Sequence, residues 1–198
     1  MKLNDKIDFV GHFTLKMFKA DGSIDTYEEK NLIMDTARSN MANLVGGWDV
    51  AMPINRLVLG TDGHVGTNIL DFKKVGENGF ETIRTQTFSE ELGNFNYQLP
   101  FDPNSSSNVK TVDADGFVEA APLVTTTCEV QRTITDRVVT YVFTIPDTAA
   151  NQDSGIGFAV AYTEAALYAG NKIFSLKTFP ARVKEDTVRF EITWSIIF

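Results

Sequence analysis

The sequence predicts a mainly β protein, an antiparallel β-sandwich with one short N-terminal helix and long surface loops. Three observations support this prediction. Several segments alternate apolar and polar residues, a run from 123 to 145 is rich in β-branched residues, and only one segment spaces its apolar residues as a helix does. Helices and strands do not alternate along the chain, which favours antiparallel sheets. We expect a single domain over residues 1–198, with a loop excursion at about 68–123.

The clearest strand pattern is "TVRFEITWSIIF", residues 187–198. Every second residue from position 188 onward is apolar, and the residues between them are charged or carry hydroxyl groups, as in a strand buried on one face. Terminal segments are usually polar and frayed unless a sheet holds them. We therefore expect an integral strand of the core or of a subunit interface. The structural or interface candidates are Phe190, Trp194, Ile196 and Phe198 in this strand, together with Asp62 and His64 in an earlier loop.

The N-terminal part predicts a β-hairpin. In "FTLKMFKADGSIDTYEEKN", residues 13–31, an apolar residue recurs at every second position before the pair Asp21-Gly22. Asp-Gly is a common tight-turn pair between two strands.

The next segment, "NLIMDTARSNMANLVGG", predicts the helix. Asp35 is expected to cap its start, and Gly46 and Gly47 are expected to end it. The apolar residues at helical spacing are Ile33, Ala37, Met41, Leu44 and Val45.

The middle of the chain is less regular. A short strand is expected from Ile54 to Leu59, followed by the glycine-rich loop of "LGTDGHVG". The segment "FETIRTQTF", residues 80–88, has the alternation of an exposed strand. The stretch from Pro100 to Pro122 is rich in serine and acidic residues and is expected to be a long surface loop.

The second half predicts more strands. In "LVTTTCEVQRTITDRVVTYVFTI", the pair Thr135-Asp136 near the middle favours a hairpin of two long strands. A polar loop from Pro146 to Gly157 follows. Two further strands are expected in "FAVAYTEAALYAG" and "KIFSLKTF", before the terminal one.

Charge and composition exclude some classes of function. The composition, 43% hydrophobic and 22% charged, is that of a folded globular protein. The net charge of -8 argues against general binding to nucleic acid or to anionic lipid, since both attract a surplus of Lys and Arg.

The single cysteine, Cys128, cannot form an intramolecular disulfide, so the fold is expected to suit a reducing compartment. The segment "MKLNDKIDFV" lacks the apolar stretch of a signal peptide, and no run approaches the ~20 apolar residues of a membrane span. A reducing cytoplasm would suit the protein.

Candidates for catalysis are few. The two histidines, His12 and His64, fall on different segments, and His64 lies beside Asp62 in the glycine-rich loop. A histidine-based triad or zinc site would need further carboxylates or thiols to converge there. An exposed loop histidine is the simpler interpretation of His64, and a small buried side chain is the simpler interpretation of Cys128.

Known binding motifs are incomplete. The glycines of "LGTDGHVG" lack the Gly-Lys-Ser/Thr of a phosphate-binding loop. The stretch from Asp113 to Gly116 resembles the start of a calcium loop, but the chelating acid expected later is missing, and a β-turn fits better. We therefore expect no cofactor and no metal.

Several blocks of the sequence together resemble the small β-rich structural proteins of tailed bacteriophage virions. The blocks are "EEKNLIMDTARSNMANLVGG", "INRLVLGTDG" and "TEAALYAGNKIFSLKTFPARVKEDTVRFEITWSIIF". The shared features are an Asn-Leu-Ile/Val segment that opens a short helix, a strand that closes on a Leu-Gly-Thr-Gly-like turn, and a final strand with Trp two positions before Ile. The similarity skips roughly residues 71–125, and Asp62 changes the turn to "GTDG".

The resemblance implies a non-enzymatic component of the tail, neck or fibre-attachment region. Such a component forms a symmetric homo-oligomer, contacts other virion proteins and is assembled in the host cytoplasm. The loops from Pro100 to Pro122 and from Pro146 to Gly157 would be candidates for contacts with neighbouring subunits.

Two other classes of function stay open. A ligand- or carbohydrate-binding β-sandwich module would be a monomer with an exposed Trp or Tyr platform, whereas the structural interpretation requires Trp194 to be buried. An enzyme of unrecognised type would draw first on His64, Asp62 and Glu164.

Overall fold

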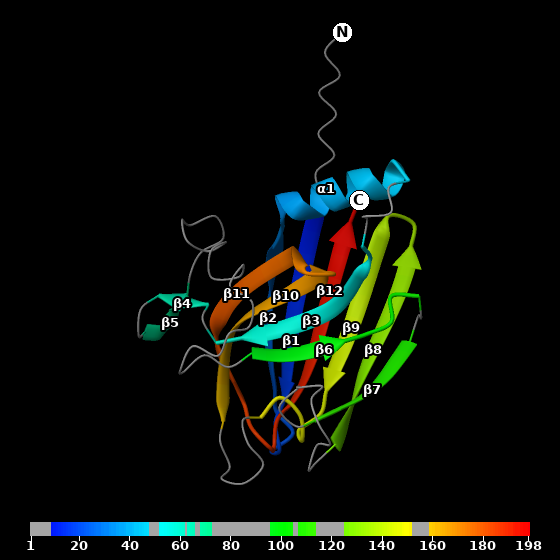
Figure 1. Ribbon diagram of the computed structural model, residues 1–198. Helices are drawn as coiled ribbons and strands as arrows, with labels where there is room; N and C mark the ends of the chain where they lie inside the picture. The colour runs from blue at the N-terminus through cyan, green and yellow to red at the C-terminus, as the bar shows by residue number, and fades with distance from the viewer. Residues whose placement is uncertain are drawn as a thin grey trace.

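The fold is mainly β and antiparallel, with one α-helix in the part of the chain that the structure describes (Figure 1). This computed structural model describes residues 9–47, 52–61, 63–65, 68–72, 96–104, 107–113, 125–151 and 159–198. The strands are β1 (Val10–Phe18), β2 (Ile24–Ile33), β3 (Ile54–Gly60), β4 (His64–Val65), β5 (Asn68–Phe72), β6 (Asn96–Pro100), β7 (Ser107–Asp113), β8 (Thr125–Thr135), β9 (Val138–Ile145), β10 (Val160–Ala169), β11 (Lys172–Lys184) and β12 (Arg189–Ile197), and the helix is α1 (Asp35–Val45).

Ten strands form one continuous sheet in the order β6-β3-β10-β11-β2-β1-β12-β9-β8-β7, and β4 pairs with β5 in a separate ribbon. The sheet curls until its two edge strands, β6 and β7, come into contact, so that it is nearly a barrel (Figure 1). The predicted two-sheet sandwich is therefore not confirmed. A one-sided apolar pattern is common to sandwiches and barrels, and the sequence does not say which strand lies beside which.

The segment after β6 closes the barrel by side-chain packing. Phe101 is buried, and its ring lies 5.6 Å from that of Tyr141 and 5.7 Å from that of Phe143, both in β9. Arg132 of β8 donates to the carbonyl of Pro103. These contacts join the segment after the edge strand β6 to β8 and β9, the two strands nearest to the opposite edge strand β7.

Aromatic side chains fill the interior. The ring of Phe13 in β1 lies 4.9 Å from Trp194 in β12 and 5.5 Å from Phe179 in β11. Tyr162 in β10 and Phe190 in β12 are 6.2 Å apart. Rings from strands far apart in the sequence thus meet in one core, as the sheet closure requires.

The predicted terminal strand is confirmed and lies in the middle of the sheet. β12 pairs with β1 over nine residue pairs and with β9 over eight. Its burial alternates as the sequence pattern predicts, with Phe190, Ile192, Trp194 and Ile196 fully buried. The Trp194 indole donates to the hydroxyl of Ser175 in β11, at 3.2 Å, so even its polar atom has a partner inside the barrel.

The helix α1 covers the end of the barrel to which β2 leads, called here the upper end (Figure 1). Ala37 is its only buried residue and belongs to the barrel core. The prediction that Asp35 caps the helix is wrong, because Met34 is the N-cap and makes no side-chain cap bond. Leu44 and Val45, two of the apolar residues at helical spacing, are exposed. Met41 is partly buried and packs against the same core, and the Thr36 hydroxyl donates to the carbonyl of Ile173 in β11.

The predicted hairpins are confirmed. Gly22 in the β1–β2 turn has a φ of 80°, which favours glycine, and the carboxylate of Asp21 accepts a bond from the Ser23 amide at 2.9 Å. In the β8–β9 turn, Asp136 has a φ of 52°, which aspartate tolerates better than most residues.

Two segments that were predicted to be surface loops differ in part from the prediction. Residues 107–113, within the stretch expected to be a surface loop, form β7, and Pro100 ends β6, a strand that the sequence did not predict. The start of the expected surface loop at 146–157 is packed against the core, where Ala149 and Ala150 have no exposed surface. The expected strand at residues 80–88 lies outside the described residues.

The glycine-rich turn after β3 has a steric role at Gly63. Its amide donates to the hydroxyl of Thr163 in β10 at 2.8 Å. A Cβ at this position would lie 2.3 Å from the carbonyl oxygen of Thr163. Only glycine therefore allows the two backbones to approach so closely.

Replacing Gly63 by Ala is expected to lower the free energy of unfolding by about 1–3 kcal/mol, because the backbone of β10 has to move away from the added methyl group. Urea unfolding followed by circular dichroism measures this. The matched control is Gly46→Ala, at the C-cap of α1 with φ -74°, where we expect a change within about 0.5 kcal/mol. Equal effects of the two variants would contradict the steric role.

Replacing Trp194 by Ala is expected to cost about 3–5 kcal/mol, since it leaves a large cavity and removes the donor to Ser175. The same unfolding measurement tests it. Trp194→Phe, which keeps most of the volume, should cost clearly less. A loss below about 1 kcal/mol for the alanine variant would show that the site collapses and that the strand is an accessory one.

Candidate functional site

The residues singled out in the last strand lie inside the core. Phe190, Trp194 and Ile196 have no exposed surface, so they act through packing and not through direct contact with another molecule. Phe198 is partly buried and makes an edge contact with Phe9, with 5.3 Å between the ring centroids. The inward side chains of this strand therefore support the fold and do not form a binding surface themselves.

The histidine candidates do not form a described site. Asp62 lies outside the described residues, and His64 begins β4, where the backbone alone is described. His12 lies in β1 opposite Ser195, and Glu164 lies in β10 opposite Gly60 and Thr178. Within the described ranges, no three His, Cys, Asp or Glu side chains come together in a way that could hold a metal ion.

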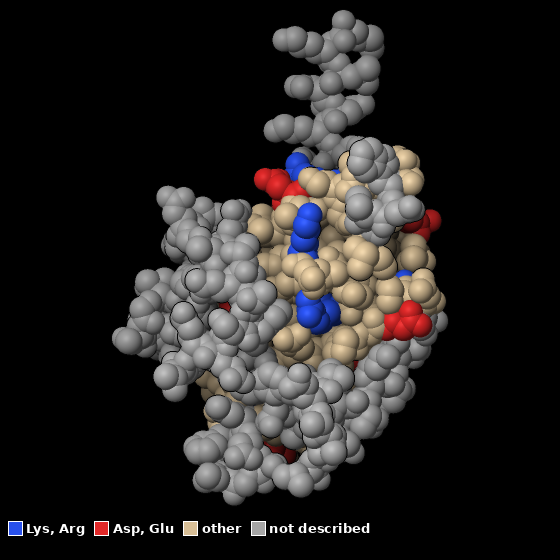
Figure 2. All heavy atoms as spheres, in the orientation of Figure 1, with Lys and Arg blue, Asp and Glu red and all other residues tan. Residues whose placement is uncertain are grey.

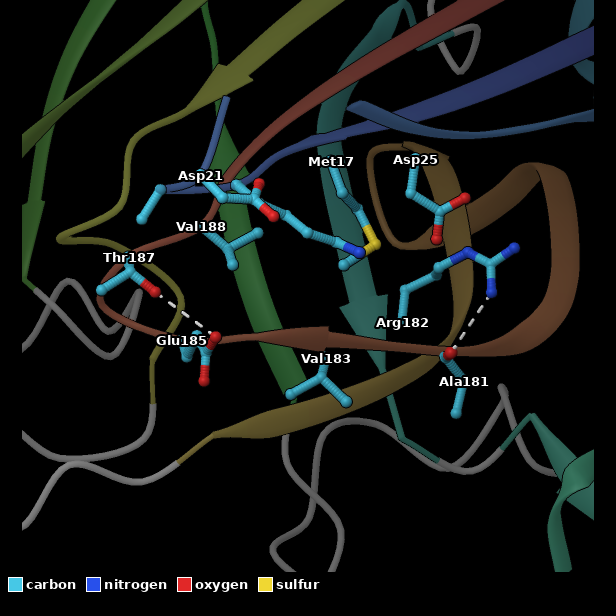
Figure 3. A pocket seen from close by; sticks show the side chains of 11 residues that line it. Met17, Asp21, Asp25, Ala181, Arg182, Val183, Glu185, Thr187 and Val188 are labelled. Atoms are coloured by element: carbon cyan, nitrogen blue, oxygen red, sulfur yellow. Dashed lines mark hydrogen bonds between the residues drawn. The ribbon is translucent and has the colours of Figure 1, made fainter. Parts of the chain in front are cut away.

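A hollow opens at the lower end of the barrel, opposite α1, between the β1–β2 turn and the end of β11 (Figure 3). Its volume is about 500 Å³. Thr187 donates to the carboxylate of Glu185 at 3.3 Å, and Arg182 donates to the carbonyl of Ala181 at 3.4 Å. The residues that carry its charges are Lys19, Asp21, Asp25, Arg182 and Glu185. Because the hollow carries both acidic and basic side chains, it suits contacts with both cationic and anionic groups.

The hollow lies below a gap in the backbone ladder. β2 and β11 pair only at Leu32 with Leu176 and at Ile33 with Ser175, and then diverge. Further along β11, the pairing with β10 also shifts register around Pro180, a residue without an amide hydrogen.

Side chains bridge the gap where backbone bonds are missing. Lys177 of β11 forms an ion pair with Glu29 of β2. The ring of Tyr27 in β2 lies 5.9 Å from the ring of Phe179. The guanidinium group of Arg182 lies 5.4 Å from the centroid of the Tyr27 ring. Burial raises the pKa of Tyr27, and the nearby Glu29 carboxylate adds to the shift. The gap is thus closed by a polar and aromatic cluster of side chains.

The barrel interior also holds a polar pair, Cys128 of β8 and Tyr97 of β6. The thiol and the phenol oxygen are 3.0 Å apart, and both side chains are fully buried. Burial raises the pKa of the Cys128 thiol, although the bond to Tyr97 opposes the shift. Cys128 is therefore the buried, unreactive residue that the sequence indicated.

Sequence reasoning missed Lys184, which ends β11. This lysine has no exposed surface. In the sequence it stands in "ARVKEDT", an ordinary charged turn, while its neighbour Val183 is exposed. The register shift at Pro180 is one event that hydropathy does not reveal, so no sequence signal identified this residue.

The large apolar side chains that are exposed among the described residues belong to segments at the two ends of the barrel. The last turn of α1 and the β8–β9 turn lie at the upper end, and the β1–β2 turn and the end of β11 lie at the lower end (Figure 1). Exposed apolar residues occur in each of these segments and at Met52, whose backbone bonds to Asn40 of α1. The exposed fractions are 47% for Leu44, 87% for Val45, 45% for Met52, 65% for Ile134, 56% for Ile24 and 41% for Val183.

The outer wall of the barrel carries few charged side chains on one described face (Figure 2). On the face in front of β3 and β10, the described surface is mostly uncharged, with a few basic side chains near its centre (Figure 2). Arg56 of β3 lies over the ring of Tyr168 at 4.9 Å and donates to the carbonyl of Gly170 at 3.0 Å. The Arg56 guanidinium thus already interacts with groups of the same chain.

Comparisons with known proteins find no matching family model, no similar curated protein and no similar solved structure. Among the described residues, no helix has the length and hydrophobicity needed to cross a bilayer.

Because Cys128 is fully buried with a raised pKa, Ellman's reagent is expected to label native protein only at the rate at which the barrel opens. Absorbance at 412 nm follows the reaction. In guanidinium chloride the same thiol should react completely within the mixing time. Rapid stoichiometric labelling under native conditions would contradict the burial.

Proposed function

We propose that this protein is a non-enzymatic structural subunit of a tailed-phage virion, which assembles as a symmetric homo-oligomer at the tail, neck or fibre-attachment region. In this proposal the subunit assembles in the host cytoplasm and contacts copies of itself and other virion proteins. The observation that carries the oligomeric part is the presence of exposed large apolar side chains at both ends of the barrel. Clustered apolar surface commonly marks protein–protein contacts.

The arrangement at the two ends favours contact between unlike ends. The upper end presents Val45 and Ile134, and the lower end presents Ile24 and Val183. Two different surfaces on opposite ends of one chain suit a heterologous contact, in which the upper end of one copy meets the lower end of the next. Such contacts build rings or columns, which are the forms of assembly that a tail or neck requires.

The blocks on which the resemblance to virion proteins was drawn lie next to one another in the fold. They contribute α1 and the strands β2, β3, β10, β11 and β12. With β1, these strands form an unbroken run of the sheet, β3-β10-β11-β2-β1-β12. The skipped middle supplies the edge strands β6 and β7. Blocks that were separate in the sequence thus belong to one structural unit.

The ligand-binding alternative finds no comparable observation in the described residues. It needs Trp or Tyr side chains on an open surface. Trp194, Tyr97, Tyr141 and Tyr162 are buried, and Tyr27 is half-buried beneath Arg182. The assembly proposal is the better supported of the two.

The mass of the purified protein, measured by light scattering after size exclusion, tests the proposal. We expect a discrete oligomer of several 22.0 kDa chains. Val45→Glu combined with Ile134→Glu should shift it to the monomer, because charge is placed in an apolar contact.

The matched control is Gln131→Glu combined with Thr193→Glu, which adds the same charge to the wall of the barrel. This control should keep the wild-type mass. A wild-type monomer at every concentration would contradict self-assembly. An end variant as oligomeric as the wild type would contradict the role of the apolar ends.

A further inference from the structure

The segment that follows β9 turns into the lower end of the barrel. Ala149 and Ala150 have no exposed surface and belong to the same core as Trp194 and Phe190. The amide of Ala149 donates to the carbonyl of Pro146 at 3.2 Å, which makes the segment a compact turn. Residues 146–151 therefore close the lower end as α1 covers the upper one.

Lys184 holds this segment from β11. Its ammonium group donates to the carbonyl of Asp147 and to the side-chain oxygen of Asn151, each at 2.9 Å, and to the carbonyl of Glu185 at 3.2 Å. Three donors thus meet three acceptors, two of which belong to the closing segment. A fully buried lysine is rare unless its donors are satisfied in this way.

A second strand holds the segment at one further point. The hydroxyl of Tyr162 in β10 donates to the carbonyl of Ala150 at 2.7 Å. Ala150 has a φ of 60°, in the left-handed region that residues with a Cβ disfavour. The segment is therefore strained at the same residue that Tyr162 fixes.

We propose that residues 146–151 are a plug that Lys184 latches, and that the plug opens without unfolding of the strands, more readily as the pH falls toward neutrality. The proposal is independent of the virion assignment. It rests on the buried segment, on the three bonds of Lys184 and on the strained Ala150.

The surroundings of Lys184 set the direction of the pH dependence. Burial lowers the pKa of Lys184 to about 7, and the acidic groups that face it, Asp147, Cys128, Asp186 and Glu185, only partly offset this. On its other side the ring of Phe190 lies 6.0 Å away and carries no titratable group.

An opened plug returns the amine to water and to its ordinary pKa of 10.5. Between these two values the open form binds more protons than the closed form, so a falling pH favours opening. The opening constant rises by at most about tenfold per pH unit and levels off below the lower value. The neutral amine of Lys184 has one hydrogen-bond donor fewer than the ammonium group. The cost of burying the charged form outweighs the loss of this donor, so the pKa is still lowered.

Hydrogen exchange of the Ala149 amide in the native protein tests the proposal. The protection factor, corrected for the intrinsic exchange rate, should rise at least tenfold from pH 7 to pH 9. Amides of β12 should stay more protected than Ala149 throughout. If Ala149 and β12 exchange with the same opening free energy, the plug does not open on its own and the proposal fails.

Lys184→Met keeps the length of the side chain and removes its donors. We expect a loss of protection at Ala149 and the disappearance of most of its pH dependence, while the control Lys172→Met, at an exposed lysine, behaves as wild type. An unchanged pH dependence in Lys184→Met would overturn the role of the latch.

Two milder variants keep the test decisive if Lys184→Met does not fold. Ala150→Gly relieves the backbone strain and should raise protection at Ala149 about fivefold without a change in β12. Tyr162→Phe removes the bond to Ala150 and should lower protection there. The opposite result for either variant would overturn the plug.

Discussion

The pairing of β12 with β1 on one side and β9 on the other is the interaction on which the rest of the structure depends. It joins the six strands from β6 to β1 to the three strands from β9 to β7. The inward side chains of β12 also supply the centre of the core, and the Trp194 indole reaches across the barrel to Ser175 in β11. Both the backbone hydrogen bonding of the sheet and the packing of its interior therefore depend on this one strand.

The opposite wall of the barrel is irregular because β11 cannot follow β2. The two strands pair at only two residue pairs, and β11 then shifts register against β10 around Pro180. The ion pair of Lys177 with Glu29 and the rings around Tyr27 then replace backbone bonds. The same irregularity leaves the lower end open enough for residues 146–151 to enter and for Lys184 to hold them. A break in the ladder thus explains both the hollow and the buried lysine.

The sequence predicted the elements better than their arrangement. Alternation identified β12, and turn residues such as Gly22 and Asp136 identified the hairpins, because both signals are local. The closure of one sheet was not predictable, since it depends on β6 meeting the far edge through Phe101. Lys184 was missed for a related reason: a single register shift buries a residue whose chemistry indicates the surface.

Native-state hydrogen exchange across the whole sheet tests most directly whether β12 holds the barrel together. The account predicts that the amides of Ile192 and Trp194 exchange only when the whole molecule unfolds, and more slowly than those of the edge strand β6. Exchange at these two amides while β3 and β10 remain protected would show that β12 can detach on its own. That result would contradict the central place given to this strand.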